Sequence, residues 1–298
     1  MATSKHYEVP PSYWPMLGTL GIFMLAMGFI FFLNHGHGMM SSLVMFVGAW
    51  VLGLTLFGWF SEVIQEQKNH LRNDPVNESM YRWSMGWFIF SEVMFFATFF
   101  GALFYVRVFV LPFLSGHTIL GMIDGQMDHL WTHFTWDTFS LHWPLLKNPS
   151  VEIMGASKTI YAFGIPLYNT LILLTSGVTI TIAHFALVKD QKLKAIVFQF
   201  LTIVLALIFV MYQYYEYQHA YHDNLTLSSG IYGNLFFLLT GFHGMHVMLG
   251  TFMLGVILFR MIRGDFSPKH HFAFEAVSWY WHFVDVVWLV LFVFVYWI

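Results

Sequence analysis

Seven long apolar stretches constrain this sequence more than any other feature. They cover residues 15–33, 39–61, 84–106, 165–188, 193–215, 231–259 and 272–297, and a bilayer-crossing helix needs roughly 20 such residues. Charged residues make up only 10% of the 298-residue chain, against roughly 25% in soluble domains. The stretches are continuously apolar, whereas strands of a membrane barrel alternate apolar with polar residues. The sequence therefore predicts an all-α integral membrane protein with seven transmembrane helices.

The basic residues predict how these helices are oriented. All but three of the 13 lysines and arginines precede the first span or lie in the second, fourth and sixth connections. The exceptions, Arg107, Lys147 and Lys158, lie in the third connection. Because cytoplasmic connections are enriched in Lys and Arg, we expect a cytoplasmic N-terminus and an external C-terminus. The third connection, residues 107–164, is then a long external loop.

One carboxylate lies inside the third span, in the sequence "SEVMFF". A charged side chain at the centre of a membrane helix costs about 2.5–3.5 kcal/mol or more, so intramembrane carboxylates face protein or water. For Glu92 two hypotheses stay open. It takes part in moving protons, or it is a neutral carboxyl hydrogen-bonded to a neighbouring helix.

Two histidines in "TGFHGMHVMLG" share one helix face, because His243 and His246 are three residues apart. This spacing permits metal binding, but hydrogen bonding across helices is the interpretation we favour. Asp285 and His246 lie equally far from the cytoplasmic ends of their spans, which places both about 20 Å deep. Glu92 lies about 12 Å deep by the same measure, and a tilt of its helix or a shift of the span boundary would bring it within reach of the others. We therefore predict one polar cluster of Glu92, His243, His246 and Asp285 that satisfies its own hydrogen bonds.

Catalytic and metal-binding motifs are not evident in the sequence. The segment "EYQH", residues 216–219, holds one Glu-x-x-His unit, whereas di-iron bundles need two such units and two more glutamates. The chain has no cysteine, which excludes disulfides and thiolate metal sites. It shows no phosphate loop, nucleophile triad or dinucleotide fingerprint. We expect no catalytic residue, no metal site and no nucleic-acid partner.

Several blocks resemble subunit III of the heme–copper cytochrome c oxidases, in the bacterial type. They are "SEVMFF", "IPLYNTLILLTSGVTITIAH", "YGNLFFLLTGFHGMHVMLGT" and "HHFAFEAVSWYWHFVDVVWLVLFVFVYW". The resemblance covers nearly the whole chain. It implies a subunit without heme or copper, which belong to subunits I and II of an oxidase that reduces oxygen and pumps protons. This subunit supports proton uptake and the stability of subunit I.

The resemblance also implies an arrangement and a set of site residues. A single membrane domain, residues 1–298, consists of a two-helix bundle (13–62) and a five-helix bundle (84–298), with a cleft between them that holds structural phospholipids. Arg260 corresponds to the residue that binds a lipid headgroup, and Trp59, Glu66 and His70 are further candidates at the cytoplasmic rim. Glu92, His243, His246 and Asp285 correspond to buried polar residues of the family.

Two other functions are weighed against this one. Subunit III of a quinol oxidase commonly lacks the first two spans, which this chain has. An independent proton channel or transporter would show inverted repeats or broken helices, and the sequence shows neither. The expected location is the bacterial inner (plasma) membrane. The loop at 107–164 is a candidate contact for cytochrome c or for an additional subunit.

Overall fold

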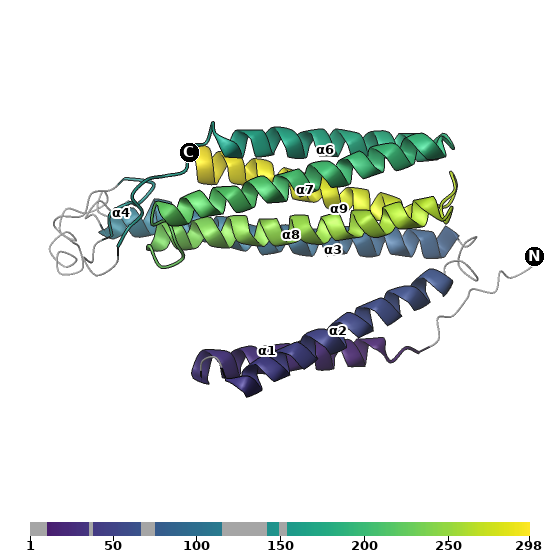
Figure 1. The fold of residues 1–298 in the computed structure, drawn as a ribbon, viewed down its shortest axis with the longest axis horizontal. Helices are drawn as coiled ribbons and strands as arrows, with labels where there is room; N and C mark the ends of the chain where they lie inside the picture. The colour runs from purple at the N-terminus through teal and green to yellow at the C-terminus, as the bar shows by residue number, and fades with distance from the viewer. Residues whose placement is uncertain (1–10, 36–37, 67–74, 115–141, 149–153) are drawn as a thin grey trace, which may run out of the picture. The chain divides into compact units, whose positions relative to one another are not determined.

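The computed structural model describes residues 11–35, 38–66, 75–114, 142–148 and 154–298 (Figure 1). Apart from turns and one isolated bridge between Ser267 and His270, the regular structure of these residues is helical. Seven helices are long and apolar enough to cross a membrane, which confirms the predicted all-α, seven-span fold. The chain divides into two compact units, Met1–Tyr81 and Arg82–Ile298.

The first unit contains a hairpin of two helices, α1 (Trp14–His35) and α2 (Met39–Glu66). Glycines allow these helices to approach closely. A Cβ atom added to Gly28 would lie 2.7 Å from the backbone nitrogen of Met45, and one added to Gly48 would lie 2.7 Å from that of Leu25. Small residues at helix contacts are a common means of association in membranes, where lipid is as apolar as the helix surface.

The second unit is built on five membrane-spanning segments. The first of them is α3 (Pro75–Tyr105), which enters this unit at Arg82 and continues through the short π-helical turn η2 (Val106–Val110) into α4 (Leu111–Leu114). The other four are α6 (Ile165–Val188), α7 (Lys192–His222), α8 (Ile231–Ile262) and α9 (Phe272–Leu291), which ends in the π-helical turn η3 (Phe292–Trp297).

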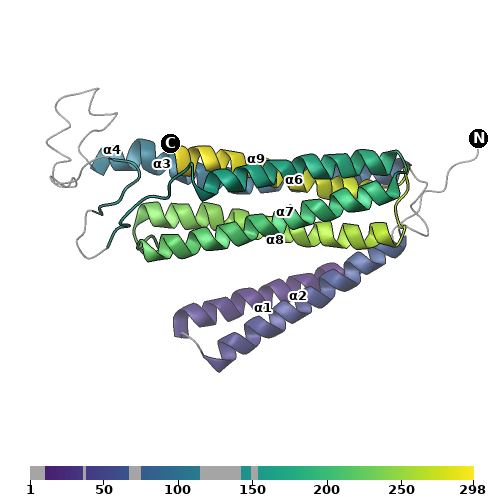
Figure 2. The same ribbon diagram turned by 45° about the horizontal axis from the view of Figure 1, so that its top comes forward.

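Four of these helices form a closed bundle (Figure 2). In sequence order α6 packs on α7, α7 on α8 and α8 on α9, while α9 returns to pack on α6. The helix α9 is the most buried of the spans, because its large side chains fill the centre of the bundle. Trp281, Trp288 and Tyr280 of α9 are almost fully buried there, together with Phe209 of α7 and Phe236 of α8.

Hydrogen bonds between side chains tie α9 to α6. The indole nitrogen of Trp281 donates to Ser176 Oγ at 2.9 Å, and that of Trp288 donates to Thr170 Oγ1 at 3.0 Å. A buried indole N–H needs an acceptor, and no water is present in a lipid environment to supply one. These two bonds therefore fix the rotation of α9 about its axis, which determines where its other polar residues point.

One boundary differs from the prediction. Residues 107–114, expected at the start of the external loop, are helical because all but one of them are apolar or proline. The exception is Arg107, whose guanidinium donates to the backbone oxygen of Ile298 at 2.7 Å and lies 5.2 Å from the ring centroid of Trp143. The third span therefore extends to Leu114 before the loop begins.

Candidate functional site

Glu92 of α3 and His246 of α8 form a hydrogen-bonded pair within the second unit. The distance from Glu92 Oε2 to His246 Nε2 is 2.9 Å. The imidazole is buried, whereas 22% of the Glu92 side chain is exposed. The sequence hypothesis that Glu92 bonds to a neighbouring helix thus has a named partner on α8.

The other nitrogen of His246 determines what this pair can do chemically. His246 Nδ1 lies 2.7 Å from the carbonyl oxygen of Phe242, and a carbonyl only accepts hydrogen bonds. Nδ1 therefore carries a hydrogen. The contact with Glu92 then needs one further proton, which lies either on the carboxyl or on Nε2. The pair is a site that holds one proton and can pass it between two atoms 2.9 Å apart.

Aromatic rings enclose His246 on several sides. Its ring centroid lies 4.9 Å from that of Phe96, 5.8 Å from that of Phe95 and 6.5 Å from that of Tyr280. Such surroundings exclude lipid and water from the imidazole and strengthen its hydrogen bond to Glu92, because the local dielectric constant is low.

His243 points to a different neighbour. Its Nε2 donates to the backbone oxygen of Val284 on α9 at 3.2 Å, since a carbonyl can only accept. Its ring centroid lies 5.8 Å from that of Phe209 and 5.1 Å from that of Trp288. His243 Nδ1 is buried and has no hydrogen-bond partner among the described residues. This histidine joins α8 to α9 rather than to Glu92.

Asp285 forms the second carboxyl–histidine contact of the bundle. Its Oδ2 lies 3.7 Å from Nδ1 of His282, one helical turn earlier on α9. His282 Nε2 contacts Thr181 Oγ1 at 3.3 Å, and that hydroxyl already donates to the carbonyl of Gly177 at 2.8 Å. His282 Nε2 is therefore the donor toward Thr181, which leaves Nδ1 facing the carboxyl of Asp285. Asp285 Oδ1 has no hydrogen-bond partner among the described residues.

The predicted four-residue cluster is thus divided in the structure. Glu92 and His246 meet, His243 bonds to the backbone beside Asp285, and Asp285 is paired with His282. Sequence reasoning missed His282, although its spacing of three residues from Asp285 on a predicted helix could have identified it.

The predicted lipid-binding residues lie in both units. Arg260 is at the end of α8, where its Nε donates to Asp265 Oδ2 at 3.4 Å and its guanidinium lies 4.8 Å from the ring centroid of Phe266. Only 12% of the Arg260 side chain is exposed. In the first unit Trp59 is exposed and Glu66 is the last, partly exposed residue of α2. His70 lies outside the described residues.

Another buried carboxyl stands apart from both pairs. Glu216 of α7, which the sequence placed at a span end, is only 2% exposed. Its Oε1 accepts a hydrogen bond of 2.6 Å from Tyr296 OH and one of 3.4 Å from Gln213 Nε2. The apolar pattern of the sequence around "EYQH" does not predict that Glu216 is buried. Its hydrogen-bond partner Tyr296 lies far away in the sequence, near the C-terminal end of the chain.

Metal ligands do not gather in the part of the chain that the structure describes. No group of three or more His, Asp or Glu side chains there is placed to hold a metal ion. The external loop predicted to contact a partner lies largely outside the described residues, because 115–141 and 149–153 are not among them.

Comparisons with known proteins identify relatives along the full chain. The family model for cytochrome c oxidase subunit III matches residues 5–117 and 146–298. Cytochrome c oxidase subunit 3 of Osphranter robustus is 36% identical over 295 residues, which cover 99% of this chain and 97% of the relative. The corresponding proteins of Tragelaphus oryx and Dugong dugon are each 35% identical with the same coverage.

Proposed function

Because the chain belongs to the cytochrome c oxidase subunit III family, we propose that it is the non-catalytic, lipid-binding subunit III of a proton-pumping cytochrome c oxidase. The observation that carries this proposal is the extent of the match, which includes all seven membrane-length helices. Heme and copper belong to subunits I and II in this proposal, and those subunits are the partners that reduce oxygen. The chain lies in a bacterial inner membrane with its N-terminus in the cytoplasm.

The proposed support of proton uptake rests on the Glu92–His246 pair. Two ionisable groups 2.9 Å apart on different helices can hold a proton, and part of the Glu92 side chain stays exposed. Intramembrane carboxylates commonly mark proton relays. The pair would therefore exchange a proton with a neighbouring subunit or with water at the edge of the bundle.

The proposed lipid binding rests on Arg260. A guanidinium carries five N–H donors in a fork that fits phosphate, and one of them is used by Asp265. The stacking on Phe266 fixes the plane of the guanidinium. Trp59, Glu66 and His70 remain proposed contacts of structural phospholipid in the first unit.

Gentle detergent purification tests the proposed function directly. We expect the chain to co-purify with larger subunits whose visible spectrum shows heme, and the complex to consume oxygen with reduced cytochrome c. Oxygen consumption with quinol alone would indicate a quinol oxidase instead. If the purified chain alone carried protons across vesicles, and Glu92→Gln abolished that flux, the chain would be an independent proton channel.

The headgroup role of Arg260 has its own test. We expect Arg260→Ala to lower the bound phospholipid and to shorten the lifetime of the oxidase during turnover. Because the substitution also removes the contact with Asp265, Asp265→Asn serves as the control that breaks the ion pair but keeps the guanidinium. Phospholipid content and turnover lifetime that are unchanged in Arg260→Ala, or equally reduced in both variants, would contradict the headgroup role.

A further inference from the structure

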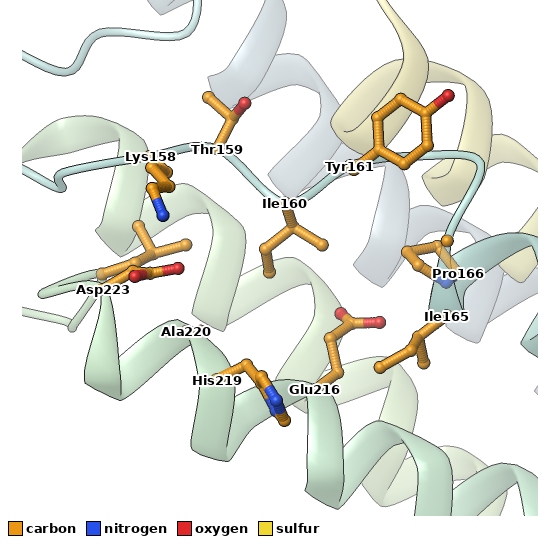
Figure 3. A pocket seen from close by; sticks show the side chains of 12 residues that line it. Lys158, Thr159, Ile160, Tyr161, Ile165, Pro166, Glu216, His219, Ala220 and Asp223 are labelled. Atoms are coloured by element: carbon orange, nitrogen blue, oxygen red, sulfur yellow. The ribbon is translucent and has the colours of Figure 1, made fainter.

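A pocket opens beside Glu216 at the end of the second unit where α6 begins and α7 ends. It has a volume of about 260 Å³ and is lined by residues 158–161, by the first residues of α6 and by the last turns of α7. Figure 3 shows the carboxyl of Glu216 projecting from α7 toward Ile160 and Pro166. The pocket is distinct from the carboxyl–histidine pairs and has no part in the proposed function.

Glu216 brings an unused hydrogen-bond acceptor to this pocket. Its Oε1 is occupied by Tyr296 and Gln213, whereas Oε2 is buried and has no partner among the described residues. A buried polar atom without a partner costs roughly 1–3 kcal/mol, so such atoms are normally paired with protein or with ordered water. The residue as a whole is 98% buried, since only 2% of it is exposed.

The start of α6 brings a backbone donor, the N–H of Ile165, to the same pocket. The first N–H groups of a helix have no partner within the helix, and the N-cap residue Gly164 offers no side chain to cap them. Of the residues here that line the pocket, Gly164 donates its N–H to the carbonyl oxygen of Tyr161 at 3.1 Å and Pro166 has no N–H, so Ile165 contributes the donor. The positive end of the α6 dipole therefore faces the same space as the unpaired oxygen of Glu216.

More unpaired polar atoms lie behind the pocket. Thr179 of α6 and Thr202 of α7 share a hydrogen bond of 2.7 Å, which fixes the register of these antiparallel helices. Toward the pocket, Asn169 of α6 lies ten residues from this bond and Gln213 of α7 lies eleven residues from it, so their depths differ by about one residue, or roughly 1.5 Å. Both amide atoms of Asn169 and Oε1 of Gln213 are buried without a partner among the described residues.

The charged and polar groups that line the pocket determine which kind of ligand it can bind. A cationic group would suit the carboxyls of Glu216 and Asp223 but would meet the positive end of α6 and the side chain of Lys158. An anionic group would be repelled by the carboxyls. Water both donates and accepts, and a buried water typically makes about three hydrogen bonds to protein groups. At about 30 Å³ per molecule, the pocket has room for several waters.

We propose that this pocket is a hydration site in which ordered water bridges Glu216 Oε2 and the first turn of α6 and connects that buried carboxyl with the aqueous phase. Water in this position lets Glu216 exchange its proton with bulk solvent at this end of the bundle. In the orientation proposed above, this end is the external one.

The first test is a structure of the intact oxidase at a resolution that shows water. We expect density for water about 2.7–3.2 Å from Glu216 Oε2, with further density between it and the pocket mouth. A pocket without such density would overturn the proposal. A lipid headgroup there, or a side chain that bonds directly to Oε2, would overturn it as well.

The second test uses hydroxyl radicals, generated from water by X-rays, which label side chains next to bound water. Tyr296, bonded to Glu216, should be labelled in the intact oxidase, and Ile160→Trp should reduce that labelling several-fold by filling the pocket. Ile160→Leu, which keeps the volume, is the control and should leave the labelling unchanged. Labelling of Tyr280, buried elsewhere, should not change in either variant. Equal labelling of Tyr296 in the wild type and in Ile160→Trp would contradict the proposal.

Discussion

Each carboxyl placed deep in this bundle meets a group that can share its proton or donate to it. Glu92 meets His246, Asp285 meets His282, and Glu216 accepts from Tyr296. In lipid the alternative is an unpaired charge, which costs several kcal/mol, so such contacts decide how helices face one another. For Glu92 the same contact also supplies a proton-holding pair.

The Glu92–His246 pair predicts different results for two substitutions. Glu92→Gln keeps a donor for His246 Nε2, so we expect normal assembly and an oxygen-reduction rate within about twofold of the wild type, or about 0.4 kcal/mol. Glu92→Leu leaves that nitrogen unpaired, which should cost about 1–3 kcal/mol of stability. Thermal release of the subunit from the complex and oxygen consumption measure the two effects. An assembled Glu92→Gln oxidase with no heme reduction would rule out a supporting role for this residue.

The sequence predicted part of this site, and geometry explains which part. Counting along a helix gives the depth of a residue but not its direction around the helix axis. Depth differed between Glu92, at about 12 Å, and His246, at about 20 Å, yet the structure brings these two residues together. Depth matched Asp285 with His246, but the indole bonds of Trp281 and Trp288 rotate α9 so that Asp285 faces Gly177 of α6.

At the scale of helices, glycines determine how closely neighbours approach, and their roles differ along α8. A Cβ atom on Gly250 would lie 2.9 Å from the ring of Trp281 and 3.3 Å from that of Tyr280. A Cβ atom on Gly244 would meet nothing within 4 Å. Both glycines lie in the same glycine-rich segment, "TGFHGMHVMLG", so the sequence does not distinguish them. Only the positions of the α9 side chains distinguish them.

Gly250→Ala and Gly244→Ala form a matched pair of variants. At Gly250 we expect a loss of about 1–3 kcal/mol, because Trp281 is fully buried, is held by Ser176 and cannot move aside. At Gly244 the same change should be neutral or should stabilise the helix by up to about 1 kcal/mol. The midpoint of thermal unfolding of the purified complex measures both. A lower midpoint for Gly244→Ala than for Gly250→Ala would show that the α8–α9 contact does not limit stability.

At the scale of the whole molecule, hydropathy and the distribution of charge carry most of the information. The seven spans were predictable because each must bury its backbone within itself, which requires about 20 apolar residues in a row. The division into Met1–Tyr81 and Arg82–Ile298 depends instead on which helices pack together. Such packing is set by the shapes of residues such as Gly28 and Gly48, and apolar periodicity does not report it.

The distribution of basic residues makes a prediction about the whole chain that needs no knowledge of its partners. If the N-terminus is cytoplasmic, the connection between α6 and α7 faces the cytoplasm and the segment before α6 faces outward. Lys189 and Met154 are exposed residues in these two places. The chain has no cysteine, so Lys189→Cys and Met154→Cys each introduce a single thiol into it.

We expect a membrane-impermeant maleimide to label the Met154→Cys variant in intact cells. The Lys189→Cys variant should be labelled only after the membrane is permeabilised, because a cytoplasmic thiol is out of reach before that. The wild-type chain is the control and should stay unlabelled in both conditions. Labelling of Lys189→Cys but not Met154→Cys in intact cells would invert the topology. It would also place the Glu216 pocket on the cytoplasmic side, since that pocket lies at the same end of the bundle as the segment before α6.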